Sequence, residues 1–242
     1  MEKFNETLIA GAAELGINIK NPEKFLQYME YVLEINKSMN LTAITQPEEF
    51  ITKHFLDSLT LLPLLPKENN IRIIDIGSGA GFPGIPLKFA NSELQITLLD
   101  SLNKRVKFLN QVVTKMKLND IRAIHGRAEE YAQKSDFRES FDFAVARAIA
   151  AMPALCGYCL PFVGIGGAFI AMKGSNYQEE LKNALPIISD LGGEIEKIHK
   201  IILPESDIER NLIIVRKRSK GKGIRKKKSQ NKKTNDLPKS PK

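Results

Sequence analysis

The sequence predicts an α/β fold, with a mostly parallel sheet that carries helices on both faces. An apolar, β-branched run at 71–76 has the composition of a parallel strand buried on both faces, and four glycines follow it closely: Gly77, Gly79, Gly81 and Gly84. From there the chain alternates strand-like and helix-like segments, the order that produces parallel sheets with right-handed crossovers. The glycine loop therefore falls at the carboxyl end of a strand, where such sheets bind ligands.

The elements of this predicted sheet can be assigned in order. Seven strands are predicted, at 71–76, 94–100, 121–125, 141–146, 167–172, 194–203 and 211–217. Helices are predicted at 83–90, 102–116, 152–162 and 176–191, with a helical turn near 127–133. The last two strands close the sheet as a pair.

Three further helices are predicted ahead of the first strand, where they form a cap beside the sheet. They cover 5–15, 22–38 and 47–62. The second begins with Asn21 as its N-cap and Pro22 at the first helical position. Its apolar residues repeat at three- and four-residue spacing, which gives one buried stripe.

The positive charge of the chain is concentrated at its C-terminal end. The 242 residues carry a formal net charge of +8, and residues 216–242 contain thirteen Lys or Arg against one acid, which leaves about −4 for the rest. This segment is too polar to form a core, so we expect a disordered basic tail that either is attracted to phosphate backbones or only aids solubility. The predicted organisation is a helical cap at 1–65, a ligand-binding domain at 66–217 and the tail at 218–242.

Other classes of protein fit less well. The N-terminal segment lacks a secretory signal pattern, so we expect a cytoplasmic location. The uncharged run 148–172 is long enough to span a membrane, but its prolines and the VGIGG break at 163–167 predict a buried helix, a turn and a core strand. Cys156 and Cys159 form a lone C-x-x-C motif, which we interpret as two core residues of one helix rather than as a redox pair or half of a zinc site. No metal is expected.

Two nucleotide ligands compete for the glycine loop. Gly79-x-Gly81-x-x-Gly84 matches the dinucleotide fingerprint of NAD-type oxidoreductases, with Asp100 about twenty residues on. Pro83 argues against a pyrophosphate, because it interrupts the segment that should open as a helix N-terminus. Asp75 argues against it too, since a carboxylate just before the first glycine suits a ligand with an ammonium group and a sulfonium. That ligand is S-adenosylmethionine, and Asp75-x-Gly77-x-Gly79-x-Gly81 looks like the first motif of class I methyltransferases.

Residues at the other strand ends then acquire roles. Asp100 is placed to accept hydrogen bonds from both ribose hydroxyls, and Ala128 and Glu129 would lie beside the adenine. Arg147 stands among apolar residues, so its guanidinium forms either a structural ion pair or a contact with the cofactor carboxylate or the substrate. Phe82 either stacks on a target base or walls the cofactor.

The third predicted helix carries His54, Asp57 and Ser58 on one face. This face either makes local hydrogen bonds or lines the ligand pocket. A nucleophilic serine is not indicated, because neither a strained turn nor an oxyanion hole is suggested there.

Basic side chains near the ligand-facing edge are candidate phosphate contacts. Lys104, Arg105 and Lys107 follow the second strand, and Lys173 ends the fifth. A solvated helix face explains Lys107 equally well.

At these residues the sequence resembles the bacterial RsmG (GidB) family of guanine-N7 methyltransferases of 16S ribosomal RNA. The matching segments are NLTAI at 40–44, HFLDSL at 54–59, DIGSGAGFPGIPL at 75–87, LLDSLNKRVKFL at 98–109, HGRAEE at 125–130, ARA at 146–148 and ESDIERNLIIVRK at 205–217. GAGFPGIPL together with DSLNKR is far more specific than the glycine motif alone. The lysine-rich tail departs from the family pattern, so no family role is carried onto it.

The resemblance implies a class I fold with S-adenosylmethionine bound by residues equivalent to Gly77, Phe82, Ala128, Glu129 and Arg147. It also implies methylation of guanine 527 in the 530 loop of 16S rRNA, with free RNA or a 30S ribosomal particle as the substrate. We expect the protein to act as a monomer.

No catalytic base is expected, because guanine N7 holds an in-plane lone pair and no proton. Phe82 and Arg147 would position the reactants, and His54 and Lys173 would contact the RNA. The alternatives are an NAD-dependent oxidoreductase and a non-catalytic RNA-binding protein. Asp75 speaks against the first, and cofactor-site residues at four separate strand ends speak against the second.

Overall fold

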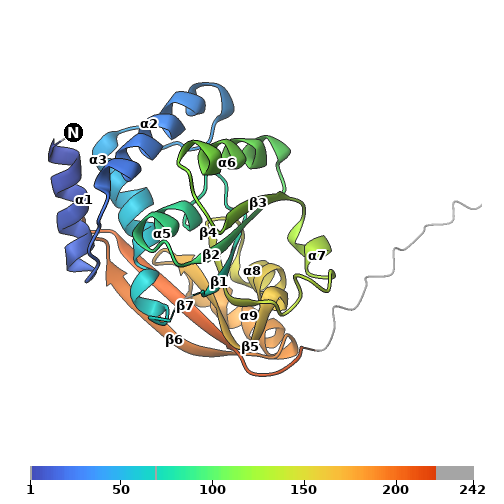
Figure 1. Cartoon of the computed structure of the whole chain (residues 1–242). Coiled ribbons are helices and arrows are strands. Elements are labelled where there is room, and N and C mark those ends of the chain that lie inside the picture. Colours follow the sequence, from blue (N-terminus) through green and yellow to red (C-terminus); the bar gives the residue numbers. More distant parts are fainter. Residues whose placement is uncertain (1, 69, 222–242) are drawn as a thin grey trace, which may run out of the picture.

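The computed structural model describes residues 2–68 and 70–221, which form one seven-stranded sheet with helices on both faces (Figure 1). The order across the sheet is β3-β2-β1-β4-β5-β7-β6. Neighbours among β1 to β5 pair in parallel, and β7 is antiparallel to both β5 and β6. The strands are β1 (Arg72–Ile76), β2 (Gln95–Asp100), β3 (Ile121–His125), β4 (Phe141–Arg147), β5 (Val163–Lys173), β6 (Gly193–Ile202) and β7 (Glu209–Lys217). The predicted strand content and the mostly parallel sheet are confirmed.

The helices also follow the predicted order. They are α1 (Glu2–Glu14), α2 (Pro22–Met39), α3 (Pro47–Phe50), α4 (Asp57–Leu59), α5 (Gly84–Ala90), α6 (Asn103–Lys115), α7 (Ala128–Tyr131), α8 (Met152–Cys159) and α9 (Gln178–Asp190). Asn21 precedes α2 as predicted, although its side chain makes no capping hydrogen bond.

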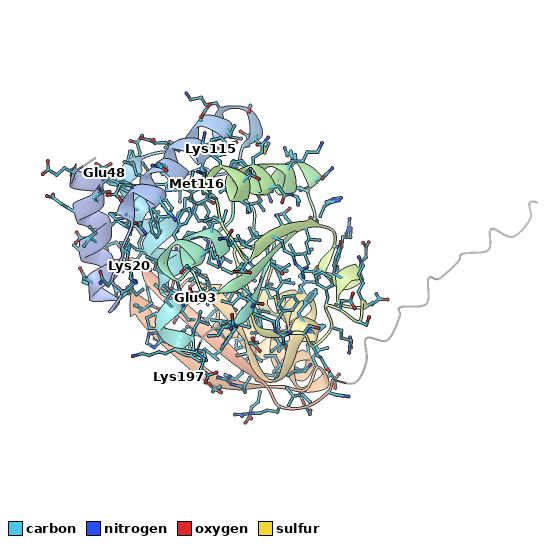
Figure 2. All side chains as sticks on the ribbon, viewed as in Figure 1. Lys20, Glu48, Glu93, Lys115, Met116 and Lys197 are labelled. Atoms are coloured by element: carbon cyan, nitrogen blue, oxygen red, sulfur yellow. The ribbon has the colours of Figure 1, made fainter. Side chains whose placement is uncertain are left out.

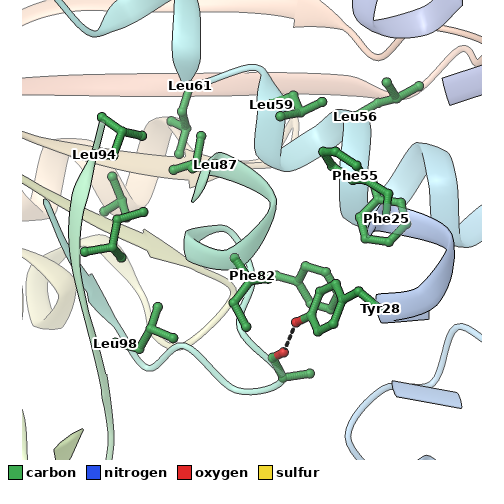
Figure 3. Packing of buried hydrophobic residues seen from close by; sticks show 14 of the residues in the cluster. Phe25, Tyr28, Phe55, Leu56, Leu59, Leu61, Phe82, Leu87, Leu94 and Leu98 are labelled. Atoms are coloured by element: carbon green, nitrogen blue, oxygen red, sulfur yellow. Dashed lines mark hydrogen bonds between the residues drawn. The ribbon is translucent and has the colours of Figure 1, made fainter. Parts of the chain in front are cut away.

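The two faces of the sheet bury two separate cores, as the period of a strand requires. In β1, Ile73 packs into a cluster with the N-terminal helices, α5 and α6, whereas Ile74 and Ile76 pack into a second cluster with α7, α8 and α9. Figure 3 shows the aromatic centre of the first cluster, where Phe25, Phe55 and Tyr28 meet. The N-terminal helices therefore share a continuous core with the sheet.

Most charged side chains lie on the outside of these layers, although a few, among them Asp57 and Asp75, are buried. Glu48, Lys115 and Lys197 are exposed and point away from the fold (Figure 2). Within residues 2–68 and 70–221, no helix has the length and apolar character needed to cross a membrane. The uncharged run 148–172 contains α8 and most of β5, in agreement with its interpretation as core. The basic tail falls mainly on 222–242, outside the described residues.

Two segments differ from the sequence predictions. The predicted helix 47–62 is divided, because a π-helical segment (Ile51–Leu56) lies between α3 and α4 and a 3₁₀ turn (Leu62–Leu64) follows. The predicted glycine break at 163–167 is part of β5, which bulges there: Phe141 pairs with Val163, and Phe143 pairs with Ala168. A wider π turn and a bulge both re-aim side chains without ending an element.

The close packing of α5 on the sheet requires a glycine at its first residue. A Cβ on Gly84 would lie 2.4 Å from a methyl carbon of Leu98 and 3.0 Å from Oδ2 of Asp75. By contrast, a Cβ on Gly157 in α8 would meet nothing within 4 Å.

Gly84→Ala should therefore destabilise the fold by about 1–3 kcal/mol, because the new methyl group overpacks the contact between α5 and β2. Gly157→Ala is the matched control and should be neutral or stabilise by up to about 1 kcal/mol, since alanine favours the helix. Urea unfolding of both variants measures the difference. Equal stabilities would contradict the packing described for Gly84.

Candidate functional site

A cavity of about 470 Å³ lies at the carboxyl ends of β1 to β4. Its lining includes Gly77, Asp100, Arg105, Ala128, Glu129 and Ile149. Four of the predicted cofactor residues, Gly77, Asp100, Ala128 and Glu129, are thus brought together from three chain segments, which follow or end β1, β2 and β3.

Of the predicted loop glycines, Gly77 lines this cavity and Gly79 and Gly81 do not, and all three have backbone conformations that favour glycine. Gly77, Gly79 and Gly81 have φ values of 71°, 60° and 101°. The N–H of Gly77 donates to the carbonyl of Leu99 at 2.7 Å, which ties the loop to β2. A Cβ on Gly77 would lie 2.6 Å from the Ile149 side chain, so the loop after β4 packs directly against it.

Asp100 ends β2 and lines the cavity next to the glycine loop. Its Oδ2 accepts the N–H of Gly79 at 2.9 Å, and its Oδ1 accepts the N–H of Leu102 at 2.8 Å. Arg105 lies 3.7 Å from Oδ2. Each carboxylate oxygen keeps further lone pairs for a ligand hydroxyl, so this geometry is compatible with the predicted ribose contact.

Asp75 is placed differently from the other acidic candidate. Its side chain is fully buried and is absent from the cavity lining; Oδ2 accepts the N–H of Gly84 at 3.0 Å, and Oδ1 has no partner among the described residues. Burial raises the pKa of Asp75 to about 7, despite the hydrogen bond from Gly84 that lowers it. In the structure Asp75 shapes the glycine loop from behind, and the predicted contact with a ligand ammonium group stays a prediction.

A second cavity, of about 400 Å³, adjoins the first. Ala148 lines both cavities. The second lining combines the apolar side chains of Ile44 and Met172 with a set of charged or polar ones: Lys53, His54, Asp57, Arg147, Lys173 and Arg210.

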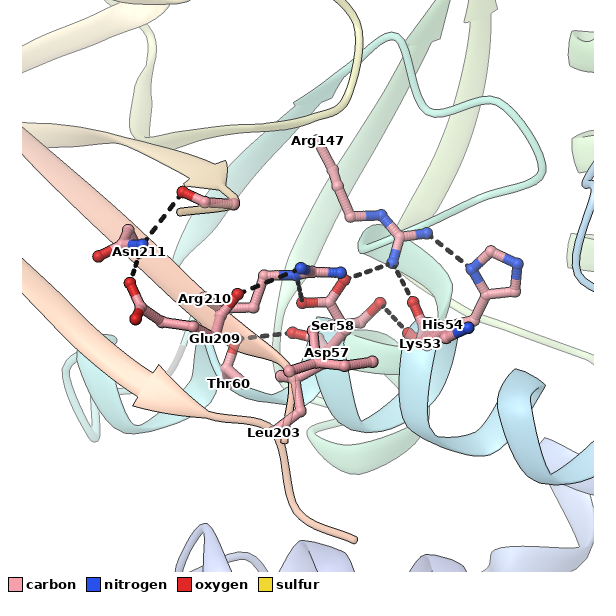
Figure 4. Close-up of polar contacts among 12 residues, drawn as sticks. Lys53, His54, Asp57, Ser58, Thr60, Arg147, Leu203, Glu209, Arg210 and Asn211 are labelled. Atoms are coloured by element: carbon pink, nitrogen blue, oxygen red, sulfur yellow. Dashed lines mark hydrogen bonds and ion pairs between the residues drawn. The ribbon is translucent and has the colours of Figure 1, made fainter. Parts of the chain in front are cut away.

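A buried carboxylate holds the polar wall of this second cavity together (Figure 4). Asp57 is 1% exposed, and its two oxygens accept hydrogen bonds from Arg147 at 3.0 Å and Arg210 at 2.9 Å. Arg147 also donates to the carbonyl of Lys53 at 2.9 Å. Two interactions were predicted for the Arg147 guanidinium. The structural ion pair is present in the structure, and the contact with cofactor or substrate stays a prediction.

His54 is neutral and has both ring nitrogens engaged. Arginine only donates hydrogen bonds, so Nδ1, which lies 3.0 Å from Nη2 of Arg147, must be an acceptor. The proton then sits on Nε2, which donates to Oγ1 of Thr42 at 2.7 Å. Burial and the charge of Arg147 lower the pKa of His54 to about 3.

Phe82 lies behind both cavities rather than in their linings. Its ring is 5% exposed and stacks on His54, with centroids 4.3 Å apart and planes 4° apart. Tyr28 packs near it and donates a hydrogen bond to the carbonyl of Ala80 (Figure 3). Phe82 thus supports His54, and its predicted direct contact with a base or cofactor stays a prediction.

The structure separates the basic candidates from one another. Arg105 lines the first cavity beside Asp100, although it was grouped with the RNA contacts, whereas Lys104 and Lys107 are exposed on α6. Lys173 lines the second cavity and pairs with Glu180 at 2.6 Å. Ser58 is buried and donates to the carbonyl of His54, the local hydrogen bonding that the sequence allowed.

Cys156 and Cys159 are free, fully buried and part of the core around α8, which confirms their interpretation as core residues. Among the described residues, no group of three or more His, Cys, Asp or Glu is arranged to hold a metal ion.

Several site residues were not singled out from the sequence. Thr42, Arg210, Ile149 and Tyr158 line a cavity or bond to a lining residue. Thr42 and Arg210 do lie within the segments that carry the family resemblance, which was the available signal. Their roles depend on contacts between distant parts of the chain.

The sheet order, the glycine loop after β1 and the acid at the end of β2 define a class I methyltransferase fold. Solved structures share this fold. The YcgJ protein from Bacillus subtilis aligns with a TM-score of 0.53 and 13% identity, over 69% of this chain and 100% of that one. TrmN from Thermus thermophilus aligns with a TM-score of 0.52 and 16% identity, over 69% of this chain and 53% of that one.

Sequence comparison identifies the particular family. The family model described as rRNA small subunit methyltransferase G (GidB) matches residues 21–211, and the chain belongs to this family. A relative from Acetivibrio thermocellus, named ribosomal RNA small subunit methyltransferase G, is 49% identical over 217 residues, or 89% of each chain. A relative of the same name from Clostridium botulinum (strain Loch Maree) is 47% identical over 84% of this chain and 85% of its own.

The raised pKa of Asp75 predicts a specific pH dependence of stability. Between pH 3.8, its ordinary pKa, and about pH 7, Asp75 is protonated in the folded state and ionised in the unfolded state. Its contribution to the free energy of unfolding is therefore greatest below pH 3.8 and is lost as the pH rises through 7. Asp75→Asn should therefore gain stability relative to wild type by up to about 4 kcal/mol between about pH 4 and 7, on top of a constant offset. Urea unfolding at several pH values measures this difference, and a difference that does not vary with pH would contradict it.

Proposed function

We propose that this chain transfers the methyl group of S-adenosylmethionine to N7 of a guanine in 16S ribosomal RNA, with guanine 527 of the 530 loop as the base implied by the family resemblance. The observation that carries the proposal is the pair of adjoining cavities that share Ala148. One has the acid and glycine backbone of a nucleoside site, and the other has the apolar and basic lining suited to an RNA base and its phosphate.

The first cavity fits S-adenosylmethionine by the chemistry of its lining. Asp100 offers carboxylate lone pairs for hydroxyl donors, and the glycine backbone at Gly77 allows close approach. Ile149 and Tyr158 supply apolar surface for the rest of the ligand. The bound cofactor supplies an electrophilic methyl group on a sulfonium.

The second cavity is the place for the target base. Ile44 and Met172 offer apolar contacts to a base, and Lys53, Lys173 and Arg210 offer donors to guanine O6 or to phosphate. The site works by orientation, because N7 already holds its lone pair and the chain needs only to align it with the methyl group and exclude water.

His54 is a positioning residue in this mechanism, not a base. Its Nδ1 accepts from Arg147 and its Nε2 donates to Thr42, so neither nitrogen is free to take a proton. Phe82 and Asp57 hold His54 and Arg147 in place from behind. We further propose that the protein acts as a cytoplasmic monomer, with residues 1–65 as the cap and 66–217 as the methyltransferase domain.

Labelled-methyl transfer to deproteinised 16S rRNA and to 30S particles tests the proposal, with the modified base mapped by cleavage at N7-methylguanine. We expect label in 16S rRNA at guanine 527. Label on tRNA or on a small molecule instead would overturn the assignment. Thermal stabilisation by S-adenosylhomocysteine but not by NAD excludes the oxidoreductase alternative.

His54→Gln should lower the rate of methyl transfer by about tenfold or less, because glutamine retains polar contacts in place of the imidazole. The wild-type rate should show no inflection near the ordinary histidine pKa, since the pKa of His54 is lowered to about 3. Single-turnover rates from about pH 5.5 to 8.5 measure this. A histidine titration present in the wild type and absent in the variant would refute it.

Lys104→Ala and Arg105→Ala should affect different ligands, although the residues are neighbours. Lys104 is exposed, so its loss should weaken RNA binding and reduce the slope of log affinity against log salt by about 1. Arg105 lines the first cavity, so its loss should mainly weaken binding of S-adenosylhomocysteine. Filter binding at several salt concentrations and calorimetry separate the effects; an unchanged salt slope in Lys104→Ala removes its phosphate role.

A further inference from the structure

The segment that joins β4 to α8, residues 148–151, forms the partition between the two cavities. Ala148 lines both cavities, and Ile149 packs on Gly77 on the side of the first. Ala148 has a φ of 55°, in the left-handed region that costs a non-glycine residue about 1 kcal/mol or more. The partition is therefore held in a conformation that its own sequence does not favour.

Two side chains from other elements hold the backbone of this partition. Lys173, the last residue of β5, donates to the carbonyl of Ala150 at 3.3 Å. Glu180, in the first turn of α9, accepts the N–H of Met152 at 2.9 Å through Oε2. The same Oε2 lies 2.6 Å from the Lys173 ammonium, so the two tethers form one unit.

Glu180 itself lines neither cavity. Its side chain is 34% exposed, and that of Lys173 is 14% exposed, so the pair sits at the rim of the fold and its energy is reduced by solvent screening. The hydrogen bond from Lys173 lowers the pKa of Glu180, so the carboxylate stays ionised at neutral pH. This geometry is that of a brace: a partly buried ion pair of modest strength is attached to a strained segment that borders both cavities.

We propose that Glu180 is a positioning residue for methyl transfer, which acts with Lys173 to fix the partition and so the relative placement of the two ligands. The inference depends on the proposed function in one respect only, which is that the ligand of the second cavity is the target base. Without the brace, the strained backbone at Ala148 is free to relax, and both cavity walls change together. In-line transfer is sensitive to such shifts, since a misplacement of about 1 Å can cost about 100-fold in rate.

Glu180→Ala, Glu180→Gln and the control Glu179→Ala test the role. Glu179 is exposed in the same turn of α9, and its substitution by alanine removes the same charge. We expect Glu180→Ala to lower kcat by about 10- to 100-fold and to weaken binding of S-adenosylhomocysteine several-fold, with an unfolding midpoint close to that of Glu179→Ala. Glu180→Gln keeps an acceptor for the Met152 N–H and should recover part of both losses.

The readouts separate this inference from the proposed function. Calorimetry with S-adenosylhomocysteine reports on the partition without any RNA, so it remains decisive even if the wild type methylates a different substrate. Equal kcat and equal S-adenosylhomocysteine affinity in Glu180→Ala and Glu179→Ala would overturn the inference. If Glu180→Ala does not fold, Glu180→Gln compared with Glu179→Gln decides in the same way.

Discussion

The buried carboxylate of Asp57 is the interaction on which the site depends. It is reached by Arg147 from β4 and by Arg210 from β7, so one residue of the N-terminal helices joins two strands of the sheet. A buried carboxylate with two hydrogen-bonded cations is satisfied, whereas any one of the three left alone would carry an uncompensated charge. The N-terminal helices are therefore a wall of the second cavity rather than a separate attachment.

Around this interaction the chain builds two unlike cavities from adjacent elements. The first combines the glycine backbone at Gly77 and the carboxylate of Asp100 with apolar side chains such as Ile149 and Tyr158, which suits a nucleoside-like ligand. The second includes four cationic side chains and one carboxylate in its lining, a positive balance that suits a polyanionic substrate. Arg147, Ala148 and Ile149 are consecutive, so the end of β4 serves both cavities within three residues.

The sequence predicts the fold well because its signals are local. The β-branched run before Gly77 and the alternation of strands and helices depend only on neighbours in the chain, and the strands confirm them. The π-helical segment at Ile51–Leu56 was not predicted, because an apolar face looks alike for α and π turns. Its consequence is local: it sets the side-chain directions of His54 and of the helix that follows.

The site was predicted only in part, and the reason is again the range of the interactions. Asp100 could be placed from strand order alone, because an acid at the end of the second strand has a fixed position in this fold. The position of Phe82 could not be predicted in this way, since its ring packs on His54, which lies in a helical segment far away in sequence. Lys104 and Arg105 are adjacent in sequence yet serve different surfaces, because successive residues of a helix point about 100° apart.

The reversed direction of β7 has a consequence for the order in which the site is made. Because β7 runs antiparallel to β5, its first residues lie beside the end of β5, and Arg210 reaches the carboxyl edge of the sheet next to Lys173. Ribosomes synthesise the glycine loop and every parallel strand before this residue. The second cavity is therefore incomplete until β7, the last strand to be synthesised, has paired with β5, whereas every lining residue of the first cavity precedes β7 in the chain.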